Sequence, residues 1–235
     1  TKRNLDVLIE DGVGIIPVES GELASGLSGE GRMAEPETIH QVIQNYFDAQ
    51  LEAEFKGKKV LVTAGPTFES IDPVRFIGNH SSGKMGYRIA EELLSRGAHV
   101  ILVSGPTKEE LEHDNLTLIP IKTAIEMLKA VQLHWNICSY GIFSAAVADY
   151  RPKSVADQKI KKNDDELSIE LIKNPDILKW AGDTKSSDQL LVGFALETSH
   201  LLENGKKKLA KKNLNLIVLN TLEDKGAGFG VDTNK

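Results

Sequence analysis

The stretch KVLVTAG, residues 59–65, is a run of apolar and β-branched residues that ends at a glycine. A run of this kind is typical of a strand buried on both faces of a parallel sheet. Comparable runs recur along the chain and predict further strands at residues 98–105, 116–121, 140–149, 189–198 and 215–220. Because helical patterns alternate with these runs, they indicate right-handed βαβ units. We therefore expect an α/β fold with a doubly wound, mostly parallel sheet.

Helical periodicity and capping residues place helices between the predicted strands, so the sheet is expected to be Rossmann-like. The helices are predicted at about residues 37–55, 81–96, 123–135 and 200–212. Ser81 or Ser82 would cap the second helix. Residues 159–174, KIKKNDDELSIELIKN, break the alternation and predict a β-hairpin flap. Residues 1–36 are glycine-rich and are expected to be irregular, and residues 226–235 are loop-like.

The composition excludes several classes of protein. Hydrophobic residues make up 40% of the chain and charged residues 26%, as in water-soluble globular proteins. A net charge of −6 argues against general nucleic-acid binding. No long apolar run or export leader is present, so no membrane partner is expected, and the single Cys138 suits a reducing, cytoplasmic location. Lysine clusters at 159–162 and 206–212 nevertheless suit a small anionic ligand.

A glycine motif follows the first predicted strand at some distance. RFIGNHSSGKMG (75–86) contains G-x-x-x-x-G-K, as a phosphate-binding loop does, but Met85 replaces the Ser or Thr that holds Mg²⁺. The motif also begins thirteen residues after Gly65, whereas such a loop follows its strand at once. We therefore disfavour an ATPase loop and expect a helix start at Ser81 whose free amides favour an anion. The plainer alternative is that the serines only cap the helix.

A second glycine site, TAGPT (63–67), lies directly after the first predicted strand. Doubly wound sheets bind nucleotides at this place, so Gly65 is a candidate nucleotide contact together with Ser81. The chain lacks G-x-G-x-x-G, which disfavours a nucleotide-binding oxidoreductase, the first rival function. A non-catalytic assembly or regulatory fragment is the second rival, because residues 226–235 contain no closing strand or helix.

Several ordered segments resemble a known family. They are VLVTAGPTFESIDPVRFIGNHSSGKMG (60–86), SAAVADYRP (144–152), KIKK (159–162), KNPDIL (173–178) and VGFALET (192–198). Together they resemble the phosphopantothenate–cysteine ligase part of the bifunctional bacterial coenzyme A biosynthesis protein. The resemblance implies that CTP activates 4′-phosphopantothenate as an acyl-cytidylate with release of pyrophosphate, and that the amine of L-cysteine then displaces CMP. It also implies Mg²⁺ and a homodimer of the ligase unit.

The first segment resembles a different family, the flavin-dependent phosphopantothenoylcysteine decarboxylase. GELASGLSGEGRMAEPETI (21–39) is similar to the C-terminal end of that enzyme, with Ser25 in place of its catalytic cysteine. We therefore expect residues 1–57 to be a decarboxylase tail with a linker helix, and residues 58–235 to be a ligase domain truncated at its C-terminus. FMN and a higher oligomer would belong to the full-length parent, and no flavin is expected on this chain.

The resemblance also assigns roles to individual residues. Asn79 would contact the acyl-cytidylate and Lys159 the CTP phosphates, and both are predicted to be catalytic. Asp149 would contact CTP, in part through Mg²⁺. The other implied nucleotide contacts are Phe143, Ser144, Ala145, Pro175, Asp176, Ile177, Leu178, Phe194, Lys208 and Lys212. Without the resemblance, Asn79 and Asp149 also suit turns, and Lys159 suits an exposed hairpin edge.

Helix geometry adds an argument about two of these lysines. Lys208 and Lys212 continue the stripe that Leu201 and Gly205 begin along the predicted helix 200–212. We therefore expect both lysines to face partly inward. Cys138 stands beside an apolar predicted strand, and it is expected to be a core residue and not a nucleophile.

Overall fold

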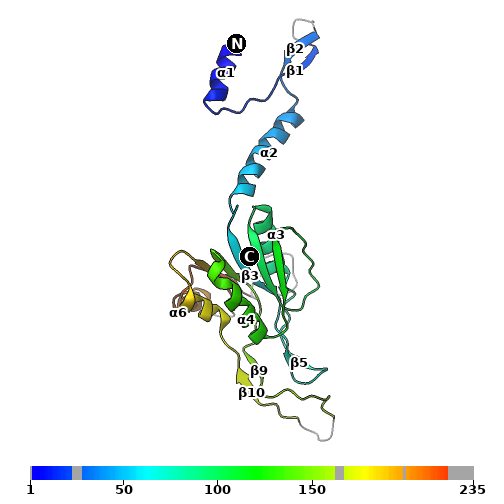
Figure 1. The fold of residues 1–235 in the computed structure, drawn as a ribbon, viewed down its shortest axis with the longest axis vertical. Coiled ribbons are helices and arrows are strands. Elements are labelled where there is room, and N and C mark those ends of the chain that lie inside the picture. The colour runs from blue at the N-terminus through cyan, green and yellow to red at the C-terminus, as the bar shows by residue number, and fades with distance from the viewer. Residues whose placement is uncertain (1, 23–27, 162–166, 198–199, 222–235) are drawn as a thin grey trace. The chain divides into compact units, whose positions relative to one another are not determined.

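The structure, a computed structural model, describes residues 2–22, 28–161, 167–197 and 200–221. The chain divides into two compact units, Thr1–Glu54 and Phe55–Lys235 (Figure 1). Within the described part of the chain, no helix is both long enough and apolar enough to cross a membrane.

The first unit contains secondary structure that the sequence did not predict. Helix α1 (Lys2–Glu10) precedes an antiparallel pair of strands, β1 (Glu19–Glu22) and β2 (Ser28–Arg32). The expectation that residues 1–36 are irregular is therefore wrong at α1, β1 and β2. The two strands were missed because strands rich in glycine carry little sequence signal. Helix α2 (Pro36–Ala53) confirms the helix predicted at 37–55. The prediction for Ser25 lies outside the described residues.

The second unit is built on a six-stranded parallel sheet. Its strands are β3 (Lys59–Ala64), β6 (His99–Ser104), β7 (Leu116–Pro120), β8 (Tyr140–Phe143), β11 (Leu190–Glu197) and β12 (Leu216–Thr221). The spatial order is β12-β11-β8-β3-β6-β7, so the winding reverses between β3 and β8. This is the order of a doubly wound Rossmann-like sheet, and the predicted fold is confirmed.

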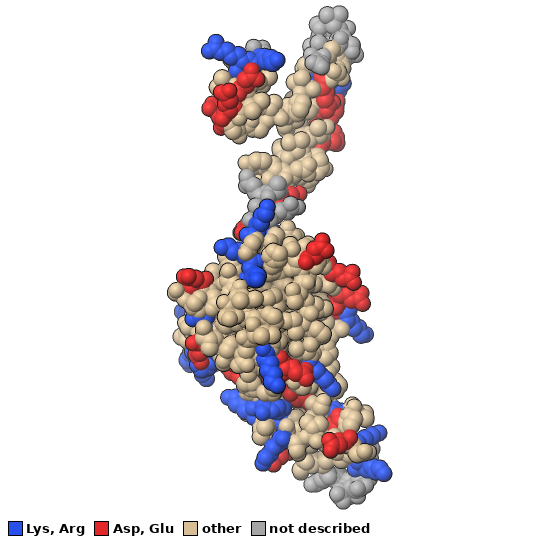
Figure 2. Space-filling view, viewed as in Figure 1, with Lys and Arg blue, Asp and Glu red and all other residues tan. Residues whose placement is uncertain are grey.

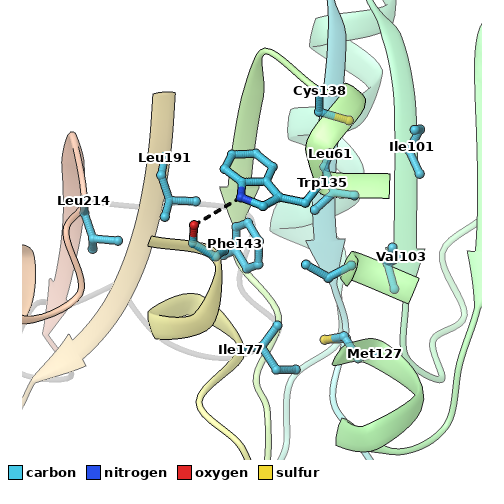
Figure 3. Close-up of a cluster of buried hydrophobic side chains, with 12 residues drawn as sticks. Leu61, Ile101, Val103, Met127, Trp135, Cys138, Phe143, Ile177, Leu191 and Leu214 are labelled. Carbon is cyan, nitrogen blue, oxygen red and sulfur yellow. Dashed lines mark hydrogen bonds between the residues drawn. The ribbon is translucent and has the colours of Figure 1, made fainter. Parts of the chain in front are cut away.

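Alternating side chains cover both faces of the sheet with apolar residues. On one face, Leu61 and Val103 pack with residues of α4 (Ala124–His134) and α5 (Ile177–Thr184). On the other, Val60 and Val62 pack against α3 (Lys84–Ser95). Figure 3 shows the first of these clusters, in which the buried Trp135 donates from Nε1 to the carbonyl of Ala181 at 3.1 Å. Strands buried on both faces explain the unbroken apolar runs in the sequence.

The helix starts agree with the prediction at α4 and differ at α3. Thr123 caps α4 in a reciprocal capping box with Glu126. The residue that caps α3 is Gly83, in a left-handed conformation with φ 82°, and neither Ser81 nor Ser82. The serines instead accept from the amides two residues ahead, at 3.3 Å for Ser81 and 3.4 Å for Ser82, because the left-handed turn at Gly83 shifts the helix start past them.

The flap is present, but its arms differ from the predicted ones. Strand β9 (Tyr150–Pro152) pairs in antiparallel fashion with β10 (Leu171–Lys173). Residues 159–161 lie in no strand, so the first arm of the predicted hairpin does not begin at KIKK, and residues 162–166 lie outside the described residues. Short strands β4 (Glu69–Ser70) and β5 (Phe76–Ile77) form a further antiparallel pair between β3 and α3. Helix α6 (Leu201–Lys211) joins β11 to β12.

Candidate active site

Strands β3 and β8 remain bonded to each other at the point where the sheet reverses. Beyond Phe143, the last residue of β8, Ser144 donates to the carbonyl of Thr63 from its amide at 3.1 Å and from its Oγ at 2.7 Å. The amide of Ala145 donates to Thr63 Oγ1 at 3.3 Å. The amides of Ser144 and Ala145 are therefore held inside the protein.

This bonding continues past the glycine after β3. Ala146 donates its amide to the carbonyl of Gly65 at 2.9 Å and accepts from the amide of Thr67 at 3.2 Å. The Oγ1 of Thr67 then accepts from the amide of Ala148 at 3.0 Å. Gly65, a predicted nucleotide contact, is buried in this seam, with φ 74°.

Asn79 ties the loop before α3 to the same seam. Its Nδ2 donates to the carbonyl of Ala146 at 2.8 Å, and its Oδ1 accepts from the amide of Ser81 at 3.3 Å. The structure therefore brings Asn79 and Ser81 to the carboxyl ends of β3 and β8. The Asn79 side chain, which is predicted to contact the acyl-cytidylate, therefore also holds the loop before α3 in place.

Close packing holds the first turn of α3 against the ends of the two strands. A Cβ on Gly86 would stand 2.5 Å from the Cβ of Ala64 and 2.7 Å from the Oγ of Ser144. Thr107 Oγ1 donates to the carbonyl of Ser82 at 2.6 Å and so fixes the turn before the helix. Thr107 was not among the predicted site residues, although GPT occurs at both 65–67 and 105–107, after neighbouring strands in matching register.

Asp149 lies further from the sheet than predicted. Strand β8 ends at Phe143, where its pairing with β11 also ends, at Gly193. Asp149 therefore lies beyond the strand and not at its end. Its carboxylate is exposed, and its carbonyl accepts from the amide of Asn174 at 2.8 Å. Asn174 is buried and also donates from Nδ2 to the carbonyl of Ala148 at 2.8 Å. Asn174, which the sequence analysis did not single out, thus joins the start of α5 to the segment after β8.

Helices α5 and α6 meet through two predicted nucleotide residues. Asp176 caps α5, where its Oδ1 accepts from the amide of Lys179 at 3.0 Å and from Lys212 Nζ at 3.1 Å. The Lys212 side chain is 24% exposed, whereas that of Lys207 is 70% exposed. Lys208 is also partly buried, so the predicted inward stripe is confirmed.

Three predicted contacts have side chains within or against the core. Phe143 is 7% exposed and meets Trp135 edge to face, with ring centroids 6.3 Å apart. Ile177 is buried in the same cluster, so Phe143 and Ile177 can offer a ligand only their backbones, and the partly buried Leu178 packs against this cluster. Phe194, a further predicted contact, lies within β11, and its side chain is partly buried.

A buried carboxylate missed by the sequence analysis holds the segment that carries Lys159. The Oδ2 of Asp72 accepts from Arg75 Nε at 2.9 Å and from the amide of Ile160 at 3.1 Å. Arg75 Nη2 donates to the carbonyl of Ile160 at 3.0 Å. The Arg75 guanidinium, helped by backbone amides, holds the pKa of Asp72 well below its usual value. Lys159 and Lys161, on either side of Ile160, are exposed.

Three other features of the second unit bear on its chemistry: its surface charge, its one thiol and its possible metal ligands. In Figure 2, Lys and Arg side chains, with some acidic ones, gather at the end of the second unit that carries β9 and β10. Cys138 is 3% exposed, as expected of a core residue, and burial raises the pKa of its thiol to about 11. Among the residues that the structure describes, no three His, Cys, Asp or Glu side chains are grouped to hold a metal.

The comparison with known families decides the identity of this domain. Residues 55–235 match the family described as the DNA/pantothenate metabolism flavoprotein C-terminal domain. The chain belongs to this family. The chain is 46% identical to the coenzyme A biosynthesis bifunctional protein CoaBC of Bacillus subtilis (strain 168) over 233 residues, which is 99% of the chain. That relative is longer, and the chain spans 57% of its length.

Two further similarities bear on this DNA/pantothenate metabolism flavoprotein domain. The chain is 46% identical over its whole length to a cysteine/cysteine sulfinic acid decarboxylase from an unknown prokaryotic organism, of which it covers 66%. A crystal structure of the C-terminal domain of a CoaBC protein superposes with a TM-score of 0.63 at 48% identity, covering 72% of this chain and 79% of that one. The resemblance stated from the sequence is therefore confirmed.

Proposed function

We propose that residues 55–235 form a CTP-dependent phosphopantothenate–cysteine ligase of coenzyme A biosynthesis. The observation that carries this proposal is the 46% identity to the B. subtilis coenzyme A biosynthesis bifunctional protein, together with the family match over 55–235. The geometry supports it, because Gly65, Asn79, Ser81 and Ser144 gather where the winding of the sheet reverses, and doubly wound sheets bind nucleotides there.

The base of CTP would lie near Phe143–Ala145. The amides of Ser144 and Ala145 already donate to Thr63, so their carbonyl oxygens would read the base. A carbonyl oxygen accepts from the 4-amino group of cytosine, whereas the O4 of uracil is itself an acceptor. A fixed carbonyl at this point therefore favours CTP over UTP.

The triphosphate would be neutralised by lysines from two segments. Lys208 on α6 and Lys212, the C-cap of α6, are partly buried, and the exposed Lys159 lies between β9 and β10. A phosphate would take Lys212 from its present partner, the carboxylate of Asp176. Asp149 suits Mg²⁺, since Mg²⁺ is usually held by one or two carboxylates together with substrate phosphates. When bound there, Mg²⁺ would supply positive charge to the phosphate oxygens.

The reaction would proceed in two steps. The carboxylate of phosphopantothenate attacks the α-phosphorus of CTP, and pyrophosphate leaves. The amine of L-cysteine then attacks the acyl carbonyl, and CMP leaves with the bonding electrons while the amine loses a proton. Asn79 Nδ2 donates one of its two hydrogens to the carbonyl of Ala146. The second hydrogen would be available to the acyl oxygen as negative charge develops there.

The test is pyrophosphate release from the purified chain with phosphopantothenate, Mg²⁺ and each of CTP, UTP, ATP and GTP, followed by addition of L-cysteine. We expect release with CTP far above the other nucleotides, and phosphopantothenoylcysteine only after cysteine is added. Equal rates with ATP would mean that the site reads the triphosphate alone. Absence of release with every nucleotide would refute the ligase proposal.

We further propose that the ligase unit is a cytoplasmic homodimer and that FMN belongs to the decarboxylase part of longer relatives. The resemblance of residues 60–198 to the ligase supports the dimer, and the single Cys138 suits a reducing compartment. The resemblance of residues 21–39 to a decarboxylase tail, in which Ser25 replaces a reactive thiol, supports the assignment of FMN. Light scattering would measure the mass in solution, and an absorbance spectrum would detect flavin. A yellow protein would contradict the assignment of FMN to the longer relatives.

A further inference from the structure

Asp72 uses both oxygens of a fully buried carboxylate. Its Oδ1 accepts from the amides of Val74 and Arg75, each at 2.8 Å, and so closes a local turn. Its Oδ2 accepts from the Arg75 guanidinium and from the amide of Ile160. One oxygen therefore serves the local turn, and the other reaches a segment 88 residues further along the chain.

The backbone of Ile160 is held at both of its polar atoms. Its amide donates to Asp72 Oδ2 at 3.1 Å, and its carbonyl accepts from Arg75 Nη2 at 3.0 Å. A second bond, from the amide of Ala156 to the carbonyl of Ile71 at 3.0 Å, holds the chain four residues earlier. Lys159 lies between these attachments, and its side chain remains exposed. The backbone that carries Lys159 is thus fixed, while its ammonium group is left available to a ligand.

We propose that Asp72 is a positioning residue that fixes Lys159 for the CTP phosphates, which rests on the proposed ligase function. Lysine carries a long, flexible side chain, and fixing its backbone lowers the entropy that is lost when the ammonium binds a phosphate. The Arg75 guanidinium offsets the charge of Asp72, so the carboxylate performs this role without repelling a triphosphate.

Two substitutions separate this role from general stability. Asp72→Asn retains an oxygen for the local turn but places an NH₂ group, which is no acceptor, opposite the amide of Ile160. The matched control is Glu69→Gln, because Glu69 is also buried and lies three residues earlier. Its Oε1 accepts from the amide of Ala124 at the start of α4, and not from the segment that carries Lys159. Asp72→Ser, whose hydroxyl can still close the local turn, serves if the asparagine variant does not fold.

The decisive measurement is a double-mutant cycle on the Kd for CTP with Mg²⁺, by calorimetry. We expect Asp72→Asn to raise the Kd about tenfold in the wild-type background and to leave it unchanged in a Lys159→Ala background, because residues that act through one contact are not additive. Glu69→Gln should have the same effect in both backgrounds. Equal effects of Asp72→Asn in both backgrounds would overturn the proposal.

Hydrogen exchange of the Ile160 amide gives a readout that does not need the ligase. Exchange should accelerate in Asp72→Asn and remain at the wild-type rate in Glu69→Gln, and an unchanged rate in Asp72→Asn would overturn the proposal. If the wild type binds CTP but forms no product, the ligase function fails while the cycle still tests Asp72. If the wild type binds no CTP, both proposals are refuted.

Discussion

Substitution of Gly86 by alanine should destabilise the second unit and weaken nucleotide binding together. The new methyl group would stand 2.5 Å from Ala64 Cβ and 3.1 Å from Ala64 Cα, atoms that have no rotamer through which to move away. Overpacking of this kind costs about 1–3 kcal/mol, and the better helix propensity of alanine returns about 1 kcal/mol. At the upper end, the net loss is about 2 kcal/mol, which lowers the Tm of a unit this size by roughly 4–8 °C.

The same methyl group meets Ser144 Oγ at 2.7 Å, so the clash also pushes α3 away from the seam that would read the base. Calorimetric unfolding would give the Tm, and CTP titration would give the Kd. Gly14→Ala is the control, since a Cβ at Gly14 meets nothing within 4 Å. A Gly86→Ala protein as stable as the wild type, with an unchanged Kd for CTP, would refute the argument that close packing positions α3.

Three further outcomes are expected. In the folded protein the pKa of Asp72 lies below its ordinary value of 3.8, so only the unfolded chain takes up a proton at Asp72 as the pH falls below about 4. Urea unfolding should therefore show that the free energy of unfolding declines with acid, and Asp72→Asn should make that decline smaller. Because burial raises the pKa of Cys138 to about 11, its thiol should resist a disulfide reagent at pH about 8 and react fully once urea unfolds the chain. Asn174→Ala removes the donor to the Ala148 carbonyl and should lower the free energy of unfolding by about 1–3 kcal/mol, and a urea midpoint equal to that of the wild type would contradict this.

The features that could be predicted are those that depend on residues close together in the sequence. The run at 59–65 and its counterparts alternate with helices, which predicts a parallel α/β sheet, and the structure confirms it. Lys208 and Lys212 could be assigned an inward face because helix geometry is local. The flap arms could not be placed, since β9 and β10 have three residues each, too few to show a period. The glycines of β1 and β2 likewise conceal a strand pair.

Contacts between distant segments account for what the sequence did not predict about the site. Asp72 bonds to Ile160 across 88 residues, and Asn174 bonds to Ala148 across 26. Nothing in the pattern around either residue distinguishes a buried polar partner from an ordinary turn residue. The end of β8 was misplaced for a related reason. Residues 144–148 are apolar enough to extend a strand, but their amides turn to Thr63, Gly65 and Thr67.

The seam between β3 and β8 also has a consequence for how the protein is made. Its bonds join residues 81 and 82 positions apart, and contacts of such long range form slowly because a large loop must close first. At a synthesis rate of roughly 5–20 residues per second, β3 is synthesised roughly 4–16 s before β8, with which it pairs. During that interval β3 can pair with β6 on one side only, so its other edge is open to incorrect pairing. The ends of β3 and β8, where we propose that the nucleotide binds, are thus joined late, and a chain arrested before β8 would lack this seam and be prone to aggregate.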